Sequence, residues 1–269
     1  MRKSIAAWKL ARFGVLTLAL LGCTRKDSLQ VAIGAVIEIP SPATGSAGEP
    51  NLALGRGDTV YLSWIEQQPD SSQALRFTTW NDQVLAAPRT IAQGKNWFVN
   101  WADFPMISAL PDGTLAAHWL QRSDTGRYSY DVQLTVSRDG GQSWSAPVRP
   151  HRDEGSGEHG FVSTFPMGDR FGVVWLDGRK HAAAAQAKSS GENGVKAEMS
   201  VRFTTLSPSG QLGADSEIDG RACDCCQTAV TVTGAGPLLV YRDRSADEIR
   251  DIYVRRYIGN QWTEGVPVH

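Results

Sequence analysis

The chain has 269 residues, of which 41% are hydrophobic, and its formal net charge at pH 7 is −1. This near-neutral balance gives no reason to expect a nucleic-acid partner, which would require a strongly basic surface. Nine Trp residues are sufficient for a large buried core, and 27 Gly residues fit a protein rich in turns.

The first 22 residues have the pattern of a signal peptide. Basic residues precede an apolar stretch, residues 13–21, that is too short to span a membrane. The stretch ends in Leu20, Leu21, Gly22 and Cys23, a sequence that resembles a bacterial lipobox. We therefore expect lipidation of Cys23 and anchoring in a Gram-negative cell envelope, at the outer membrane or on the periplasmic side. An ordinary signal peptide with a spare cysteine is the alternative.

The rest of the chain divides into a tether and a repeated β-rich region. Residues 23–48 are expected to form the lipidated N-terminus and a tether, because their last part is rich in Pro, Ser and Gly. Four similar segments follow within residues 49–269, at about 49–94, 95–154, 155–221 and 222–269. No segment has a clear helical period.

Each segment contains a second strand that ends in an aromatic residue, and an alternating third strand follows it. These aromatic residues are Trp64, Trp119, Trp175 and Tyr241. Four-stranded units repeated at this spacing predict an all-β fold, a β-propeller with about four antiparallel blades. A β-sandwich of irregular hairpins is the alternative.

Residues 137–144 have a distinctive turn sequence between two strand-like runs. The Asp139 carboxylate is suited to accept backbone N–H groups of a tight turn, and Gly140 and Gly141 allow positive φ. We expect Trp144 to bury its indole beneath this hairpin. The pattern S-x-D-x-G-x-S-W, carried by Ser137, Asp139, Gly141 and Trp144, resembles the Asp-box, or BNR repeat, of the sialidase (neuraminidase) superfamily.

Blade topology sorts the loops onto two faces. The loops after the second strands and the connections between blades share one face, here termed the connection side, and the Asp139 turn lies opposite. Arginines and carboxylates gather on the connection side. Arginine recognises carboxylates, and paired carboxylates perform glycoside hydrolysis. The predicted catalytic residues are Asp103, Asp177, Arg179, Arg242, Arg244 and Glu248, and the predicted substrate-binding residues are Trp101, His159, Arg250 and Asp251. A rim of structural ion pairs is the alternative.

Residues 181–196 lengthen one loop of the connection side. Their Ala, Gly, Ser and Asn content favours a disordered insertion over a lid.

Three cysteines, Cys223, Cys225 and Cys226, lie in the connection into the fourth segment. In an oxidising compartment they would give one disulfide and one unpaired thiol. A soft-metal site completed by His159 or His181 is the alternative, although C-x-C-C is not a standard zinc spacing. We expect the disulfide, no bound metal and no cofactor.

A closer resemblance is to a bacterial lipoprotein group described as exo-α-sialidase-like. It rests on residues 223–228, 241–245 and 248–252, which read C-D-C-C-Q-T, Y-R-D-R-S and E-I-R-D-I. The resemblance implies a six-bladed propeller, so the chain would be C-terminally truncated and a further cysteine would pair the odd thiol.

Sialidase-like chemistry would use three arginines on the substrate carboxylate, a Tyr–Glu nucleophile and an Asp acid/base. The nucleophilic Tyr belongs to a late blade outside this sequence, and the nearest match to the Arg-Ile-Pro motif, residues 37–40, lacks the arginine. The resemblance nevertheless implies a glycosidase-like lipoprotein that hydrolyses acidic, sialic-acid-type glycans. A non-catalytic glycan- or protein-binding envelope lipoprotein is the alternative. We expect a carbohydrate partner, membrane contact only through the lipid anchor, and no nucleic acid.

Overall fold

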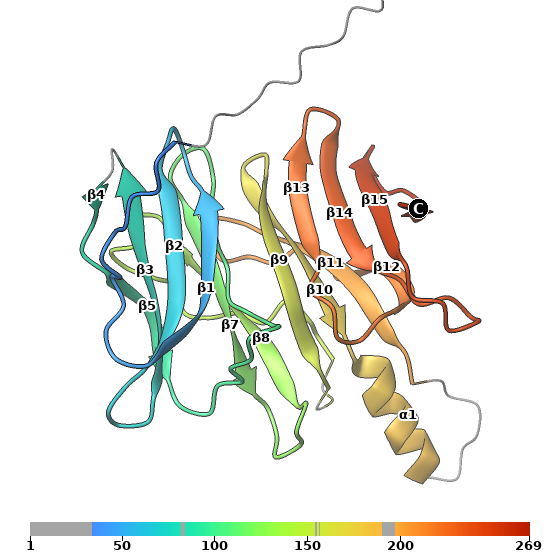
Figure 1. The fold of residues 1–269 in the computed structure, drawn as a ribbon. Coiled ribbons are helices and arrows are strands. Elements are labelled where there is room, and N and C mark those ends of the chain that lie inside the picture. Colours follow the sequence, from blue (N-terminus) through green and yellow to red (C-terminus); the bar gives the residue numbers. More distant parts are fainter. Residues whose placement is uncertain (1–33, 82–83, 154, 156, 190–196) are drawn as a thin grey trace, which may run out of the picture. The chain divides into compact units, whose positions relative to one another are not determined.

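The computed structural model describes residues 34–81, 84–153, 155, 157–189 and 197–269 (Figure 1). The predicted signal peptide and the lipidation site Cys23 lie outside the described residues. Residues 41–269 form one unit, separate from residues 1–40, and contain all the strands described below. Within the described ranges, no helix has the length and apolar character needed to cross a membrane.

Four antiparallel sheets follow one another along the chain. The first contains β1 (Ala47–Leu54), β2 (Val60–Gln67), β3 (Gln73–Asn81), β4 (Val84–Leu85) and β5 (Arg89–Gly94). The second contains β6 (Ile107–Ala109), β7 (Leu115–Arg122) and β8 (Tyr130–Ser137). The third contains β9 (His159–Met167), β10 (Arg170–Asp177), β11 (Met199–Leu206) and β12 (Ser216–Ala222). The fourth contains β13 (Ala229–Thr233), β14 (Gly236–Arg242), β15 (Ile252–Ile258), β16 (Gln261–Trp262) and β17 (Val266–Pro267).

The sheets pack face to face in chain order, as propeller blades do. The first strands of successive sheets, β1, β6, β9 and β13, are spatial neighbours. Three apolar clusters fill the spaces between the first and second, second and third, and third and fourth sheets. The aromatic residues that end the second strands are all buried. The predicted all-β, blade-based propeller fold is therefore confirmed.

The helix α1 (Arg179–Ser189) follows β10 and corrects the expectation of a disordered insertion for residues 181–189, whereas residues 190–196 lie outside the described residues. Its sequence contains four consecutive alanines, residues 182–185, and alanine has the highest helix propensity. Asp177 accepts the backbone N–H of Arg179 at 3.1 Å, and Lys188 lies in the last turn, where a positive charge is favourable. The helix has no apolar stripe, so a search for amphipathic periodicity does not detect it.

The Asp139 turn is closed by hydrogen bonds to side chains. Asp139 Oδ1 accepts the backbone N–H groups of Gln142 and Ser143 at 3.0 and 2.9 Å. The Ser137 hydroxyl donates to Asp139 at 2.8 Å and accepts the N–H of Gly141 at 2.7 Å. These bonds, led by those from Ser143, hold the pKa of Asp139 below its ordinary value. The turn follows the end of β8 that pairs with Leu115, opposite the connection side.

The indole of Trp144 is partly buried, and its main neighbour belongs to another sheet. It packs edge-on against Phe77 of the first sheet, with ring centroids 6.0 Å apart and planes at 85°. Gly141 also faces Phe77, and a Cβ at this position would collide with the ring. The turn therefore joins the second sheet to the first.

We predict that Gly141→Ala lowers the free energy of unfolding by about 1–3 kcal/mol more than Gly140→Ala, because only the former overpacks Phe77. The two glycines are a matched pair: both have positive φ, 84° and 69°, but open space surrounds Gly140. Both variants bear the strain of a left-handed residue. Urea unfolding of the two variants measures the difference, and equal losses would show that contact with Phe77 does not constrain the turn.

Candidate functional site

Strand register places the predicted site residues at one end of the sheets. Arg122 pairs with Tyr130, and Asp177 pairs with His159, at the ends of the strands where the connections between sheets arrive. In the fourth sheet, Arg242 pairs with Ile252 at the equivalent position. This is the connection side, which α1 marks in Figure 1.

A carboxyl cluster lies between the second and third sheets. The Tyr130 hydroxyl lies 2.9 Å from Glu158 Oε1 and 3.3 Å from Asp103 Oδ2. Asp103 Oδ1 accepts the backbone N–H of Phe161 at 2.7 Å. Tyr130 is fixed from the other side by Phe98, whose ring stacks on it with centroids 3.9 Å apart. Asp103, Tyr130 and Glu158, which are distant in sequence, therefore form one hydrogen-bonded cluster.

Burial sets the protonation of this cluster. Asp103 is only 2% exposed, and burial raises its pKa to about 7, although the N–H of Phe161 and the Tyr130 hydroxyl act in the opposite direction. Burial also raises the pKa of Glu158, against the hydrogen bond from Tyr130. Two neighbouring carboxyl groups with raised pKa values retain a proton closer to neutral pH than ordinary carboxyl groups do.

Asp177, the last residue of β10, and Arg179, the first residue of α1, form a bidentate pair. Arg179 Nε and Nη2 donate to Asp177 at 2.6 and 2.7 Å, and Nη2 also donates to Asp215 at 3.0 Å. Trp175 donates its indole N–H to Asp177 at 2.8 Å. Burial would raise the pKa of Asp177, but Arg179 outweighs it and holds the pKa low. The Arg179 guanidinium is therefore engaged within the protein.

Two buried histidines stack next to Asp177. The rings of His151 and His159 are parallel, with centroids 3.7 Å apart and planes at 2°. Asp153 approaches both, at 3.1 Å from His151 Nδ1 and 3.2 Å from His159 Nε2. Burial lowers the pKa of both rings, yet Asp153 and Asp177 outweigh it for His159, whose pKa is raised.

Two donor sets in this stack have ligand atoms within 4.8 Å of one another and are therefore geometrically able to hold a metal ion. They are Asp131, His151 and His159, and Asp153, His159 and Asp177. In both sets, carboxylate oxygens already lie within 3.7 Å of the imidazole nitrogens.

The arginines of the fourth sheet surround Glu248. Arg244 donates to both of its oxygens at 2.9 Å, and Arg250 donates at 3.1 Å. Arg221 also contacts it. The pKa of Glu248 is lowered, chiefly by the hydrogen bonds from Arg244. A lowered pKa makes Glu248 a poor proton donor, so its predicted role in proton transfer is restricted to accepting a proton.

The cysteine loop, residues 223–228, carries three free thiols, and the expected disulfide is not formed among them. The Arg242 guanidinium contacts Cys226 Sγ at 3.7 Å. Neither His159 nor His181 belongs to the donor set of the cysteines in the described part of the chain, contrary to the metal alternative considered from the sequence.

The predicted residues thus separate by accessibility. Trp101 is 85% exposed and available to a ligand, and Asp251 is also partly open. Asp103, Asp177 and His159 are buried, so direct contact with a substrate does not fit their positions, and we assign them to the supporting framework. Sequence reasoning overlooked Tyr130, Asp131, His151 and Asp153, because no local motif connects residues from separate strands and loops.

A cavity of about 540 Å³ lies away from these residues, between the third and fourth sheets. Its lining includes Phe203, Glu217, Arg255 and Trp262, and none of the predicted site residues. This cavity therefore does not coincide with the predicted site.

Comparison with known proteins supports the fold. No protein-family model matches the sequence, and neither does any curated protein. Among solved structures, the Penicillium chrysogenum α-L-arabinanase in complex with arabinobiose aligns with a TM-score of 0.52 and 14% identity, over 82% of this chain and 65% of that one. The Fusarium graminearum α-L-arabinofuranosidase Arb93A with an iminosugar inhibitor gives a TM-score of 0.52 and 13% identity, over 82% and 64%. A Dyadobacter fermentans DSM 18053 protein of unknown function gives 0.50 and 14%, over 82% and 68%.

The chain spans slightly less than two thirds of the length of the two named enzymes. At 13–14% identity, the likeness establishes a fold shared with propeller glycoside hydrolases.

We predict that Asp103→Asn removes a pH dependence of stability. Because the folded pKa of Asp103, about 7, exceeds its ordinary value of 3.8, its stabilising contribution is complete below pH 3.8 and lost as pH rises through about 7. Asparagine keeps an acceptor for Phe161 but carries no charge. The free energy of unfolding of the variant, relative to that of the native protein, should therefore rise by roughly a few kcal/mol between pH 4 and pH 8. Urea unfolding of both proteins across this range measures the gain, and a constant difference would contradict it.

Proposed function

We propose that the chain is a glycosidase-like propeller that cleaves anionic, sialic-acid-type glycans on its connection side. The observation that carries the proposal is the Asp103–Tyr130–Glu158 cluster, a carboxyl pair bridged by a hydroxyl, with both carboxyl pKa values raised. Glycoside hydrolysis uses as its general acid a carboxyl group that is protonated near neutral pH, and burial favours this state in the cluster.

The accessibility of the cluster suggests separate roles for its members. Glu158 is only partly buried, so it is the carboxyl group that would donate a proton to a leaving group. Tyr130 would position Glu158, and Asp103 would support Tyr130 from inside the protein. Trp101, on the same loop as Asp103, would provide an aromatic surface for a sugar ring.

The anionic group of the substrate would bind near Arg242. This guanidinium contacts a thiol rather than a carboxylate, whereas Arg179 and Arg244 are each engaged by carboxylates. The neighbours named as α-L-arabinanase and α-L-arabinofuranosidase support a carbohydrate substrate in general. The anionic preference rests on the arginines and on the sequence resemblance.

We further propose that the protein acts in the cell envelope, attached through lipidated Cys23. The basic and apolar pattern of residues 1–22 and the lipobox-like sequence before Cys23 support this location.

We predict that the full chain hydrolyses a fluorogenic sialoside or uronide, and that Glu158→Gln lowers kcat about 10²–10⁴-fold by removing the general acid. Activity should fall on the alkaline side, above the ordinary carboxyl range, because burial raises the pKa of Glu158. Initial rates between pH 4 and 9 provide the measurement.

Asp169→Asn is the matched control. It is an exposed carboxylate in the turn between β9 and β10, at the other end of these strands, and should leave kcat unchanged. Loss of activity in both variants, or no turnover of sialosides, uronides and arabinofuranosides by the native chain, would overturn the proposal.

Glycan binding without turnover is the second candidate, favoured by the contrast between an exposed Trp101 and buried carboxyl groups. In this case Trp101→Ala should weaken binding of an acidic oligosaccharide by up to about tenfold, the size expected for one aromatic contact. Isothermal titration calorimetry measures it. Trp80→Ala, on the first sheet, should bind as the native chain does, and equal weakening in both would exclude a specific role for Trp101.

A further inference from the structure

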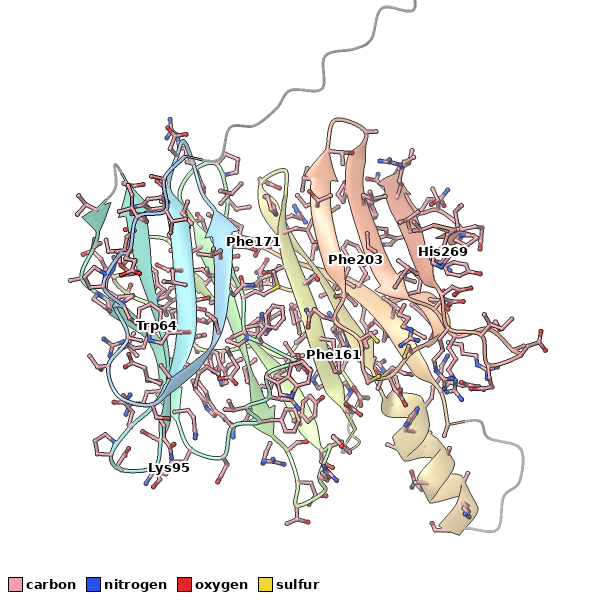
Figure 2. All side chains as sticks on the ribbon, in the orientation of Figure 1. Trp64, Lys95, Phe161, Phe171, Phe203 and His269 are labelled. Carbon is pink, nitrogen blue, oxygen red and sulfur yellow. The ribbon has the colours of Figure 1, made fainter. Side chains whose placement is uncertain are left out.

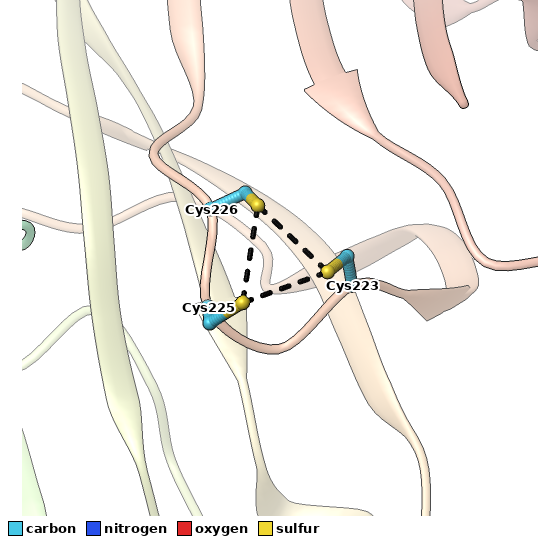
Figure 3. Close-up of side chains that lie close together, drawn as sticks. All are labelled: Cys223, Cys225 and Cys226. Carbon is cyan, nitrogen blue, oxygen red and sulfur yellow. Dashed lines mark hydrogen bonds between the residues drawn. The ribbon is translucent and has the colours of Figure 1, made fainter. Parts of the chain in front are cut away.

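Three thiols of the cysteine loop face one another in a nearly equilateral triangle (Figure 3). The Sγ atoms of Cys223 and Cys225 are 3.8 Å apart, those of Cys225 and Cys226 are 4.0 Å apart, and those of Cys223 and Cys226 are 3.8 Å apart. The similar separations single out no pair for a disulfide, and a disulfide would leave the third thiol unused.

The size of the triangle fits a metal ion. The circumradius of an equilateral triangle is its edge divided by √3, so a central point lies about 2.2 Å from each sulfur. Bonds between thiolate sulfur and zinc are about 2.3 Å long. An ion of this size would therefore bind all three sulfurs at or just above their plane.

The loop is held in place from both sides before any ion binds. The backbone N–H of Cys223 donates to Arg242 O at 2.9 Å, at the end of β14. Gln227 and Thr228 donate to the backbone oxygens of Val162 and Phe161 in β9, at 2.9 and 2.8 Å. The positions of the sulfurs thus follow from two sheets rather than from a free loop.

The surroundings favour a thiolate at Cys223 only, because burial and the neighbouring thiols raise the pKa of Cys225 to about 12, so a bound ion would displace that proton. Burial would raise the pKa of Cys223, but the backbone N–H of Cys225, the neighbouring thiols and the positive charge of Arg242 together lower it. Arg242 also contacts Cys226 directly. A thiolate is the form that binds a metal.

The donor set distinguishes between metals. In the described part of the chain, the cysteines are joined by no His, Asp or Glu ligand. Structural zinc sites are almost always four-coordinate, whereas an all-thiolate set of three suits a soft monovalent ion. We propose that Cys223, Cys225 and Cys226 bind one Cu(I) ion in trigonal coordination. This departs from the expectation of no bound metal. The site borders the proposed anion site at Arg242, but Cu(I) binding does not require glycoside hydrolysis.

Accessibility indicates how the ion would enter. Cys223 is buried, Cys226 is partly buried and Cys225 is exposed. The ion therefore reaches the triangle from the solvent side of Cys225, where a copper-carrying thiol is able to exchange it.

Anaerobic titration of the reduced full chain in detergent with Cu(I), in competition with bicinchoninate, should give one Cu(I) per chain. X-ray absorption should give three sulfurs at about 2.2–2.3 Å. Cys225→Ser should weaken binding at least about 100-fold and reduce the sulfur count to two. Because Cys225 is exposed, its replacement should leave the thermal unfolding temperature unchanged.

Cys23→Ser is the matched control, since it changes the fourth cysteine, the proposed lipidation site, leaves the triangle intact and should retain one tightly bound Cu(I). Glu158→Gln should also bind Cu(I) as the native chain does, which separates this proposal from that of hydrolysis. A sulfur count below three in the native chain, unchanged affinity in Cys225→Ser, or displacement of Cu(I) by equimolar Zn²⁺ would overturn the assignment.

Discussion

The packing of one sheet face against the next is the constraint on which the rest of the structure depends. Side chains alternate along each strand, so a sheet has two faces, and a blade is stable when its apolar faces meet a neighbour. Buried aromatic residues occupy these junctions, including Trp119, which stacks on Trp97 with centroids 5.4 Å apart, and Trp175, which lies between the second and third sheets. Where no described neighbour covers the sheet, as on the first strand, Leu52 and Leu54 are exposed.

Because of this packing, the charged and titratable side chains of the candidate site lie at one end of the sheets. The first strands lie next to one another, so the connections that enter them converge at one end of the sheets. Charged residues brought to this end neutralise one another: Arg179 is engaged by Asp177 and Asp215, and Arg244 by Glu248. Asp103 and Glu158 differ from these pairs, because burial raises their pKa values although the shared Tyr130 hydroxyl acts to lower them. The contrast between paired and desolvated carboxylates is what makes the second group chemically distinctive.

The sequence predicts well what depends on local pattern. The recurring aromatic residues identify the second strands, and the turn at Asp139 forms the hydrogen bonds expected of its side chain. The sequence predicts poorly what depends on contacts between sheets. Trp144 packs on Phe77 of another sheet, and Tyr130 meets Glu158 only because two strands are adjacent. The α1 helix is missed for another reason: alanine stabilises helices without producing an apolar stripe.

Phe161, labelled in Figure 2, connects the two groups of reactive side chains through its backbone. Its N–H donates to Asp103 at 2.7 Å, and its carbonyl accepts the Thr228 hydroxyl of the cysteine loop at 2.8 Å. Its φ of 51° is rare for a bulky residue and costs of the order of 1–3 kcal/mol, so surrounding contacts must maintain it. Both hydrogen bonds belong to those contacts. A change in the cysteine loop that shifted Thr228 would weaken this restraint, move the N–H that stabilises the Asp103 carboxylate, and thereby alter the pKa of the carboxyl cluster.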